Sequence, residues 1–430
     1  MVIPMKICFV SIQWPPIITG GGGIAVVSLA RELAKRHDLT VYTFGLGNLA
    51  EEEIMDLDGA RIRVIRIFTS DSDRITTPFD GTKNEEIMRL LEFANRLIRK
   101  IDCSQYDVIH LHGHFVVPGM ARALRELKCG CAIISTIHAF ESLIELEKGE
   151  FSSIPSVFNT IVTMERDALE YSDFVTVASR SLLKRVMQIH GPQYLRRVRV
   201  LHMGIDDKLF EEPVDDDYVS RIRNTYLGSR GSLLFNLNRI DPHKGIEYII
   251  GALGHIDTYS LSLVIAGKYE ERNQSYLEML MERKRAVEET SSHRITILRN
   301  IDEKTKISLF DAADIFVMAS PTEAFGLTIL EALARKTPVI VTDAEGPREI
   351  FDVYDDIKEK FIEIDGGLMV NFSDPQKREK NLAAAIVYML DNINHFKKKA
   401  EKISESIREK FSWRTISYEF ESLYREALHT

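Results

Sequence analysis

Two glutamates stand eight residues apart in the segment PTEAFGLTILEALA, residues 321–334. On one continuous α-helix Glu323 and Glu331 would point about 80° apart, so they would not share a face. The pattern favours a loop that carries Glu323 and a helix that begins near Gly326 and carries Glu331 in its second turn. A carboxylate can accept hydrogen bonds from both hydroxyls of a diol, so Glu331 could hold a ribose and Glu323 the hydroxyls of a sugar. An amphipathic helix with two exposed glutamates is the alternative.

The start of that helix is a candidate anion site. A helix N-terminus presents backbone N–H groups without intrahelical partners, and here the groups of Leu327 and Thr328 would face a diphosphate. Phe325 and Gly326 precede them directly. We therefore predict that all four residues take part in binding a phosphorylated donor.

A second strand-to-helix turn carries two cations. In NRIDPHKG, residues 238–245, Arg239 and Lys244 flank a turn that Pro242 stiffens. A nucleoside diphosphate gains negative charge as its glycosidic bond breaks. A guanidinium and an ammonium beside a helix N-terminus could offset that charge in place of a divalent metal ion. A solvated basic turn explains this segment equally well when it is considered alone.

A third such turn consists of four glycines. Gly20, Gly21, Gly22 and Gly23 lead into a helix-like stretch, so a backbone could approach a phosphate closely there. The spacing is not the Gly-x-Gly-x-x-Gly of a nicotinamide site, and the loop before it is too long for one. A flexible turn without a ligand is as good an interpretation.

These turns need strands and helices to position them, and the chain supplies two series of both. Apolar strands alternate with stretches of helical spacing, which predicts a parallel sheet covered on both faces. The expected strands are residues 6–13, 39–45, 62–68, 107–113, 132–138, 174–179 and 198–203 in the first series, and 233–239, 261–266, 295–298, 315–319 and 338–342 in the second.

The acidic segment 206–217 lies between the two series and is typical of a linker. We therefore predict two Rossmann-like, doubly wound α/β domains, residues 1–205 and 206–412, with ligands in an interdomain cleft at the carboxyl ends of the strands. Asp215, Asp216 and Asp217 resemble a metal-binding Asp-x-Asp. Their position before a helix-like stretch favours helix capping instead, so we predict no metal site.

Net charge, apolar runs and cysteine content disfavour several classes of function. The net charge is −9, which disfavours general nucleic-acid binding. No apolar run is long enough to span a membrane, and we expect no signal peptide. Four cysteines are too few for a disulfide framework, so we expect a reducing cytoplasm. Cys129 and Cys131 could be half of a metal site, but no second cysteine pair exists, and ordinary residues are the better interpretation.

Two features have a functional and a structural interpretation. His110, His112 and His114 share one strand face and could bind zinc, but polar groups at a cleft edge are the better interpretation. Helix 180–190 carries Lys184 and Arg185 beside apolar residues and could touch a membrane surface weakly. Packing on its own sheet is favoured.

Taken together and in this order, the motifs resemble the retaining glycosyltransferases of family four, which have the GT-B fold. The resemblance covers nearly the whole chain and includes the glycine turn, TIHAF at residues 136–140, HMGID at 202–206 and the Glu-x7-Glu spacing of Glu323 and Glu331. It implies that a final helix, residues 413–428, returns to the N-terminal domain. The N-terminal domain, residues 1–205 with 413–430, would then bind the acceptor, and residues 206–412 the donor.

The resemblance also implies roles for single residues. Arg239 and Lys244 would bind the donor phosphates, Glu331 would hold the ribose, and Glu323 would contact the transferred sugar. His138 would lie near the reacting face of that sugar. The expected reaction transfers a glucose-type hexose from a UDP-, ADP- or GDP-sugar to a sugar or other small acceptor, with retention and without a metal or cofactor.

Two departures from the family pattern concern specificity. Glu345 and Gly346 stand where a Gly-Gly pair is common, and Ala324 replaces a common glycine. EAFGLT, with Gly346, Pro347 and Glu349, is similar to the branch of sucrose synthases and sucrose-phosphate synthases. A nucleotide-sugar epimerase of the same fold and a non-catalytic sugar-nucleotide-binding protein remain alternatives.

Overall fold

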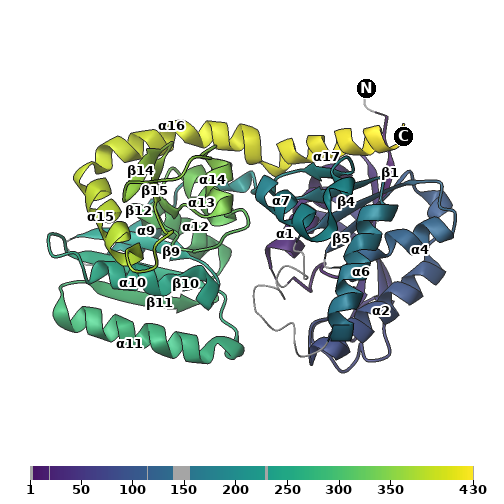
Figure 1. Ribbon diagram of the computed structural model, residues 1–430, viewed down its shortest axis with the longest axis horizontal. Coiled ribbons are helices and arrows are strands. Elements are labelled where there is room, and N and C mark those ends of the chain that lie inside the picture. The colour runs from purple at the N-terminus through teal and green to yellow at the C-terminus, as the bar shows by residue number, and fades with distance from the viewer. Residues whose placement is uncertain (1–2, 19, 114, 139–154, 228–230, 430) are drawn as a thin grey trace. The chain divides into compact units, whose positions relative to one another are not determined.

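A computed structural model describes residues 3–18, 20–113, 115–138, 155–227 and 231–429. The chain forms two compact units (Figure 1): unit 1 is Met1–Gly204 with Trp413–Thr430, and unit 2 is Ile205–Ser412. The chain passes from unit 1 to unit 2 one residue before the expected boundary, and it returns at Trp413. Each unit is an α/β domain built on a largely parallel sheet, as predicted.

The sheet of unit 1 has eight strands in the order β3-β4-β2-β1-β5-β6-β7-β8. Among the described residues, neighbouring strands pair in parallel except β3 with β4. The order reverses direction between β1 and β5. The strands are β1 Lys6–Ser11, β2 Asp38–Gly45, β3 Glu52–Leu57, β4 Ala60–Phe68, β5 Val108–Gly113, β6 Ala132–Ile137, β7 Phe174–Val177 and β8 Val198–Val200.

The sheet of unit 2 has seven strands in the order β11-β10-β9-β12-β13-β15-β14. Among the described residues of unit 2, only β14 and β15 pair antiparallel. Here the order reverses between β9 and β12. The strands are β9 Ser232–Leu237, β10 Leu261–Gly267, β11 Arg294–Arg299, β12 Ile315–Val317, β13 Val339–Thr342, β14 Phe361–Ile364 and β15 Gly367–Val370.

Helices follow most of the parallel strands and bury apolar faces against them. Those of unit 1 are α1 Gly21–Ala34, α2 Lys83–Lys100, η1 Cys103–Gln105, α3 Val116–Gly119, α4 Ala121–Glu126, α6 Pro155–Tyr171, α7 Arg180–His190, η3 Pro192–Tyr194 and α17 Trp413–Ala427. Those of unit 2 are α8 Lys208–Glu211, α9 Asp216–Tyr226, η4 Pro242–Lys244, α10 Ile246–Leu253, η5 Glu271–Asn273, α11 Gln274–Thr290, α12 Glu303–Ala312, α13 Leu327–Ala334, α14 Glu345–Ile350, α15 Arg378–Asp391 and α16 Ile393–Phe411.

The segment expected to be a linker is folded. It contains α8, and Asp215 caps α9 by accepting a hydrogen bond from the backbone N–H of Tyr218 at 3.0 Å. Asp215 also pairs with Lys304 at 2.9 Å. The three aspartates therefore place charge at a helix N-terminus, as predicted: Asp215 is the cap, and Asp216 and Asp217 lie in the first turn. No group of three potential metal ligands occurs among the described residues.

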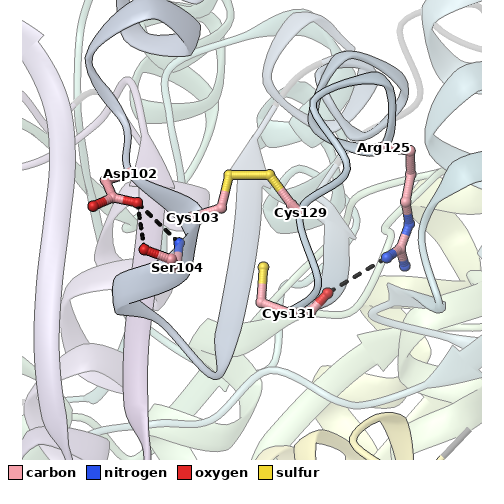
Figure 2. Close-up of a disulfide and its surroundings, with 6 residues drawn as sticks. All are labelled: Asp102, Cys103, Ser104, Arg125, Cys129 and Cys131. Carbon is pink, nitrogen blue, oxygen red and sulfur yellow. Dashed lines mark hydrogen bonds between the residues drawn. A yellow bond between two sulfur atoms is a disulfide. The ribbon is translucent and has the colours of Figure 1, made fainter.

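The low cysteine count predicts a reducing compartment, yet two of the four cysteines form a bridge. Cys103, in η1, and Cys129, after α4, form a disulfide with their Cα atoms 5.5 Å apart, and the bridge closes a loop of 26 residues (Figure 2). Cys8 and Cys131 are buried free thiols. Because one bridge exists, the cysteine count no longer supports an inference about the compartment, and the cytoplasmic location stays a prediction.

The apolar residues of α7 are engaged within unit 1. Leu182 and Val186 belong to a buried cluster with β6 and β7, and Leu183 and Met187 pack against it. This is the packed arrangement that the sequence favoured over membrane contact. In the part of the chain that the structure describes, no helix is long and apolar enough to cross a membrane.

Candidate active site

The strand order of unit 2 places its charged motifs side by side. In doubly wound sheets, ligands bind beyond the carboxyl ends of the strands where the order reverses, which here is between β9 and β12. Arg239 and Lys244 follow β9, and Glu323 follows β12. Residues that are far apart in the sequence therefore meet at one point of the sheet edge.

Lys244 and Glu323 form an ion pair there. The Nζ atom of Lys244 lies 2.7 Å from Oε2 of Glu323, and both side chains are largely buried. Gly245 makes the approach possible because its φ is +61° and an added Cβ would lie 2.1 Å from the carbonyl oxygen of Ala319. The backbone after η4 therefore rests directly on the end of β12, which brings the ammonium to the glutamate.

Arg239 is placed differently from Lys244. Its side chain is exposed, and it forms no ion pair with the described residues. A guanidinium in this state can bind an anion without first giving up a protein partner. The two predicted phosphate ligands thus consist of one paired cation and one exposed cation.

The segment that follows Glu323 has the predicted geometry. Glu323 lies in a loop, and α13 begins at Leu327, after Gly326 with φ at +103°. That left-handed conformation favours glycine, so Gly326 is what lets the helix start beside the loop. The first-turn N–H groups of Leu327 and Thr328 therefore stand at the same edge of the sheet as Lys244.

Gly346 supports this loop from the next helix. Its N–H donates to the carbonyl oxygen of Glu323 at 2.8 Å, and an added Cβ would lie 2.4 Å from the carbonyl oxygen of Phe325. Only a glycine allows that contact. The preceding Glu345, which departs from the family pattern, is exposed. Phe325 is buried and packs edge-on against Phe411.

Glu331 lies in the second turn of α13, as predicted, and its partner was not foreseen. Oε1 of Glu331 lies 3.1 Å from Nζ of Lys306 on α12, and the same ammonium lies 2.7 Å from Oε1 of Glu303. Burial raises the pKa of the Glu331 carboxyl, and the charge of Lys306 opposes that rise. Burial alone would lower the pKa of Lys306, but the two glutamates raise it.

In unit 1 the glycine turn meets His138. Helix α1 begins at Gly21, and an added Cβ at Gly22 would lie 3.3 Å from Cγ of His138, which directly follows β6. An added Cβ at Gly23 would lie 2.5 Å from Oε1 of Gln13. The start of α1 thus packs on two polar side chains, and larger residues would displace them. Gly20 caps the helix without a contact that a Cβ would disturb.

His110 and His112 are buried side chains on β5. Nδ1 of His110 lies 2.6 Å from the hydroxyl of Tyr424 in α17, and Nε2 lies 2.7 Å from Oγ1 of Thr136. The ring centroid of His112 lies 3.7 Å from that of His110, with the two rings tilted by 36°. Burial lowers the pKa of both rings. His114 and residues 139–140 of TIHAF lie outside the described residues.

A small cavity lies beside these rings in unit 1. His112, Thr136 and His138 line it together with Trp413 and Phe420 of α17. The tail helix therefore belongs to the core of unit 1, as the resemblance implied, and it helps to form the surroundings of His138.

The residues missed by the sequence analysis are partners of residues it did find. Lys306 pairs with Glu331 from 25 positions away, and Tyr424 reaches His110 from 314 positions away. Neither Lys306 nor Tyr424 belongs to a motif. Only the packing of helices on the sheets reveals these contacts.

Comparison with known proteins identifies both halves of the chain. Residues 19–209 match the model of Glycosyltransferase Family 4, and residues 228–410 match that of Glycosyl transferases group 1. An uncharacterized glycosyltransferase of Methanocaldococcus jannaschii is 26% identical, and the alignment covers 99% of each chain.

Solved structures share the fold. Sucrose-phosphate synthase from Thermosynechococcus elongatus aligns with a TM-score of 0.77 at 20% identity, over 99% of each chain. Anabaena HepE in complex with UDP-glucose aligns with a TM-score of 0.68 at 17% identity, over 98% of this chain and 100% of that chain. The family recognised from the motifs is thereby confirmed: the chain joins a glycosyltransferase family 4 domain to a group 1 domain, and it is a glycosyltransferase of the GT-B fold.

Proposed function

We propose that this glycosyltransferase moves a glucose-type hexose from a nucleoside diphosphate to a sugar or other small acceptor, with retention and without a metal ion. The observation that carries the proposal is the gathering of Arg239, Lys244, Glu323 and the start of α13 at the point where the sheet order of unit 2 reverses. A similar solved structure that holds UDP-glucose supports a nucleotide-sugar donor.

Each group in unit 2 has a part that suits its chemistry. Arg239, Lys244 and the N–H groups at the start of α13 bind the diphosphate, whose charge grows as the glycosidic bond breaks. Glu331 accepts hydrogen bonds from the ribose hydroxyls. Glu323 accepts from the hydroxyls of the transferred sugar, and its ion pair with Lys244 couples the sugar position to the phosphate position.

Retention follows from a front-face transfer. The bond between the anomeric carbon and the leaving phosphate oxygen breaks while the acceptor oxygen bonds to that carbon from the same face. The acceptor proton passes to the leaving phosphate oxygen, so no protein base is required. Arg239 and Lys244 stabilise the departing diphosphate, and His138 in unit 1 is the proposed contact with the reacting face of the sugar.

Proton NMR of the first product formed from an α-linked donor tests this proposal. The anomeric coupling expected is that of an α-linkage. A β-linked initial product would overturn the retaining mechanism. If a changed nucleotide sugar forms without any acceptor, the protein is an epimerase of the same fold, and the transfer proposal is wrong.

A further inference from the structure

One ammonium in unit 2 has no part in the reaction described so far. Lys306, in the first turn of α12, lies between two carboxylates, 2.7 Å from Oε1 of Glu303 and 3.1 Å from Oε1 of Glu331. Its side chain is 17% exposed and that of Glu331 is 18% exposed, whereas Glu303 is 68% exposed. The buried contact of Lys306 is therefore the one with Glu331.

The contact with Lys306 affects both the position and the ionisation of the Glu331 carboxylate. The ammonium binds one oxygen, Oε1, and so restrains the position of the carboxylate while Oε2 keeps its acceptor positions. A largely buried carboxyl without a cation tends to take up a proton. A protonated carboxyl turns one oxygen into a donor, and it then accepts poorly from two neighbouring hydroxyls.

We propose that Lys306 is a positioning residue for the donor, which orients Glu331 to accept the 2′- and 3′-hydroxyls of the nucleotide ribose and so sets the selectivity for ribose over deoxyribose. This inference rests on the proposed function, since it needs a nucleotide at the edge of unit 2. It adds a residue that acts through Glu331 and does not itself touch the diphosphate.

The surroundings of Lys306 argue against a purely structural role. Helix α12 is already capped by Asp302, which accepts from the N–H of Thr305 at 2.7 Å, and it is anchored by the buried Ile307, Leu309 and Phe310. The contact with the exposed Glu303 is screened by water and contributes little to stability. Replacement of Lys306 should therefore leave the helix folded.

The test compares UDP-glucose, or the ADP- or GDP-glucose that the wild type turns over, with its 2′-deoxy counterpart. In Lys306→Met we expect the donor KM to rise about tenfold with kcat within twofold of wild type. The ratio of the KM for the 2′-deoxy donor to the KM for the ribose donor should fall towards one. Lys306→Arg should restore part of the wild-type ratio. Lys306→Gln serves as a second charge-removing variant if Lys306→Met does not fold.

Lys304 supplies a matched control on the same helix. It is exposed and pairs with Asp215, so Lys304→Met should keep the wild-type discrimination between the two donors. The pH response gives an independent measure. The charged groups that face Glu331 are Lys306 and Glu303, both on α12. Without Lys306 the carboxyl needs a higher pH to ionise, so the raised KM of Lys306→Met should fall as the pH increases.

The outcomes separate the two proposals. A wild type that turns over no nucleotide sugar would overturn the proposed function and this inference with it. A wild type that is active and discriminates, together with a Lys306→Met variant of unchanged KM and discrimination, would overturn the role of Lys306 alone. Loss of kcat with unchanged discrimination would also reject it.

Discussion

The carboxyl edges of the two sheets carry different kinds of residue. In unit 2 the edge carries charge: the Lys244–Glu323 pair, exposed Arg239, and Glu331 paired with Lys306. In unit 1 the corresponding edge is formed by glycines and imidazole rings. Of these rings, His110 and His112 are buried, and burial favours their neutral form because it lowers their pKa values. A charged edge suits a diphosphate, whereas neutral, closely packed groups define shape and hydrogen-bond direction.

Removal of a cation from unit 2 should have the largest effect on catalysis. Lys244→Ala should lower kcat about 10²–10³-fold, equivalent to about 2.7–4 kcal/mol, because the diphosphate carries more charge in the transition state than in the ground state. Steady-state kinetics with the donor varied measures this effect. Lys358→Ala, at an exposed lysine before β14, is the control. Near-normal kcat with only a raised KM would show that Lys244 contributes uniform binding.

Reduction of the disulfide should affect unit 1 and leave unit 2 unchanged. A bridge that closes a loop of 26 residues stabilises the fold by about 3.5 kcal/mol through the entropy of the unfolded chain. Both tryptophans, Trp14 and Trp413, are buried in unit 1, so tryptophan fluorescence during urea unfolding reports on that unit. The midpoint should fall when dithiothreitol is added.

Two variants control for other effects of the reductant. Cys131→Ser keeps the bridge and should remain sensitive to dithiothreitol, whereas the double variant Cys103→Ser, Cys129→Ser should not respond. If the wild-type midpoint is the same with and without reductant, the bridge does not stabilise unit 1.

Low pH should also destabilise unit 1. The pKa values of His110 and His112 are lowered by burial, so in the folded state both rings stay neutral at a pH where the unfolded chain binds protons. The contribution of these rings to the free energy of unfolding is therefore fully present above about pH 6.5 and is lost as the pH falls below that value. Each histidine loses up to about 1.4 kcal/mol for every pH unit.

Tryptophan-monitored unfolding at pH 7, 6 and 5 measures this loss. His112→Phe removes one titrating ring and should make the loss per pH unit about half as steep. Stability that stays flat between pH 7 and pH 5 would contradict the view that these rings are held neutral.

The smallest effect expected comes from the tail helix. Tyr424→Phe removes the hydroxyl that lies 2.6 Å from Nδ1 of His110 and leaves that nitrogen buried without this partner. The cost should be about 1–3 kcal/mol of unit 1 stability, with little change in donor KM. Tyr418→Phe, on the exposed side of the same helix, should be close to neutral. Equal effects of the two substitutions would show that the hydrogen bond is unimportant.

Much of the fold could be predicted because parallel strands buried on both faces have a strong sequence pattern. All twelve expected strands appear, with ends shifted by a few residues. The missed strands are β3, which forms an antiparallel hairpin with the expected β4, and β14 and β15, which form a second hairpin. Their turns contain Asp58-Gly59 and Asp365-Gly366, and an Asp-Gly pair between short apolar runs is a hairpin signal.

The site was predictable only where local sequence controls geometry. The positions of Glu323 and Glu331 followed from Gly326, which can adopt the positive φ that starts α13. The contacts of Glu331 with Lys306, and of Cys103 with Cys129, depend on how distant helices and turns pack. No periodicity in one segment encodes such pairs, so they emerged only from the structure.

We propose that the cations of unit 2 bind a nucleoside diphosphate sugar without a metal ion. Isothermal titration of UDP-, ADP- and GDP-glucose into the protein in excess chelator tests it most directly. We predict that one of the three binds at one site per chain, and that Arg239→Ala weakens its binding. Binding that appears only when a divalent cation is restored, or an Arg239→Ala variant with unchanged affinity, would contradict the account.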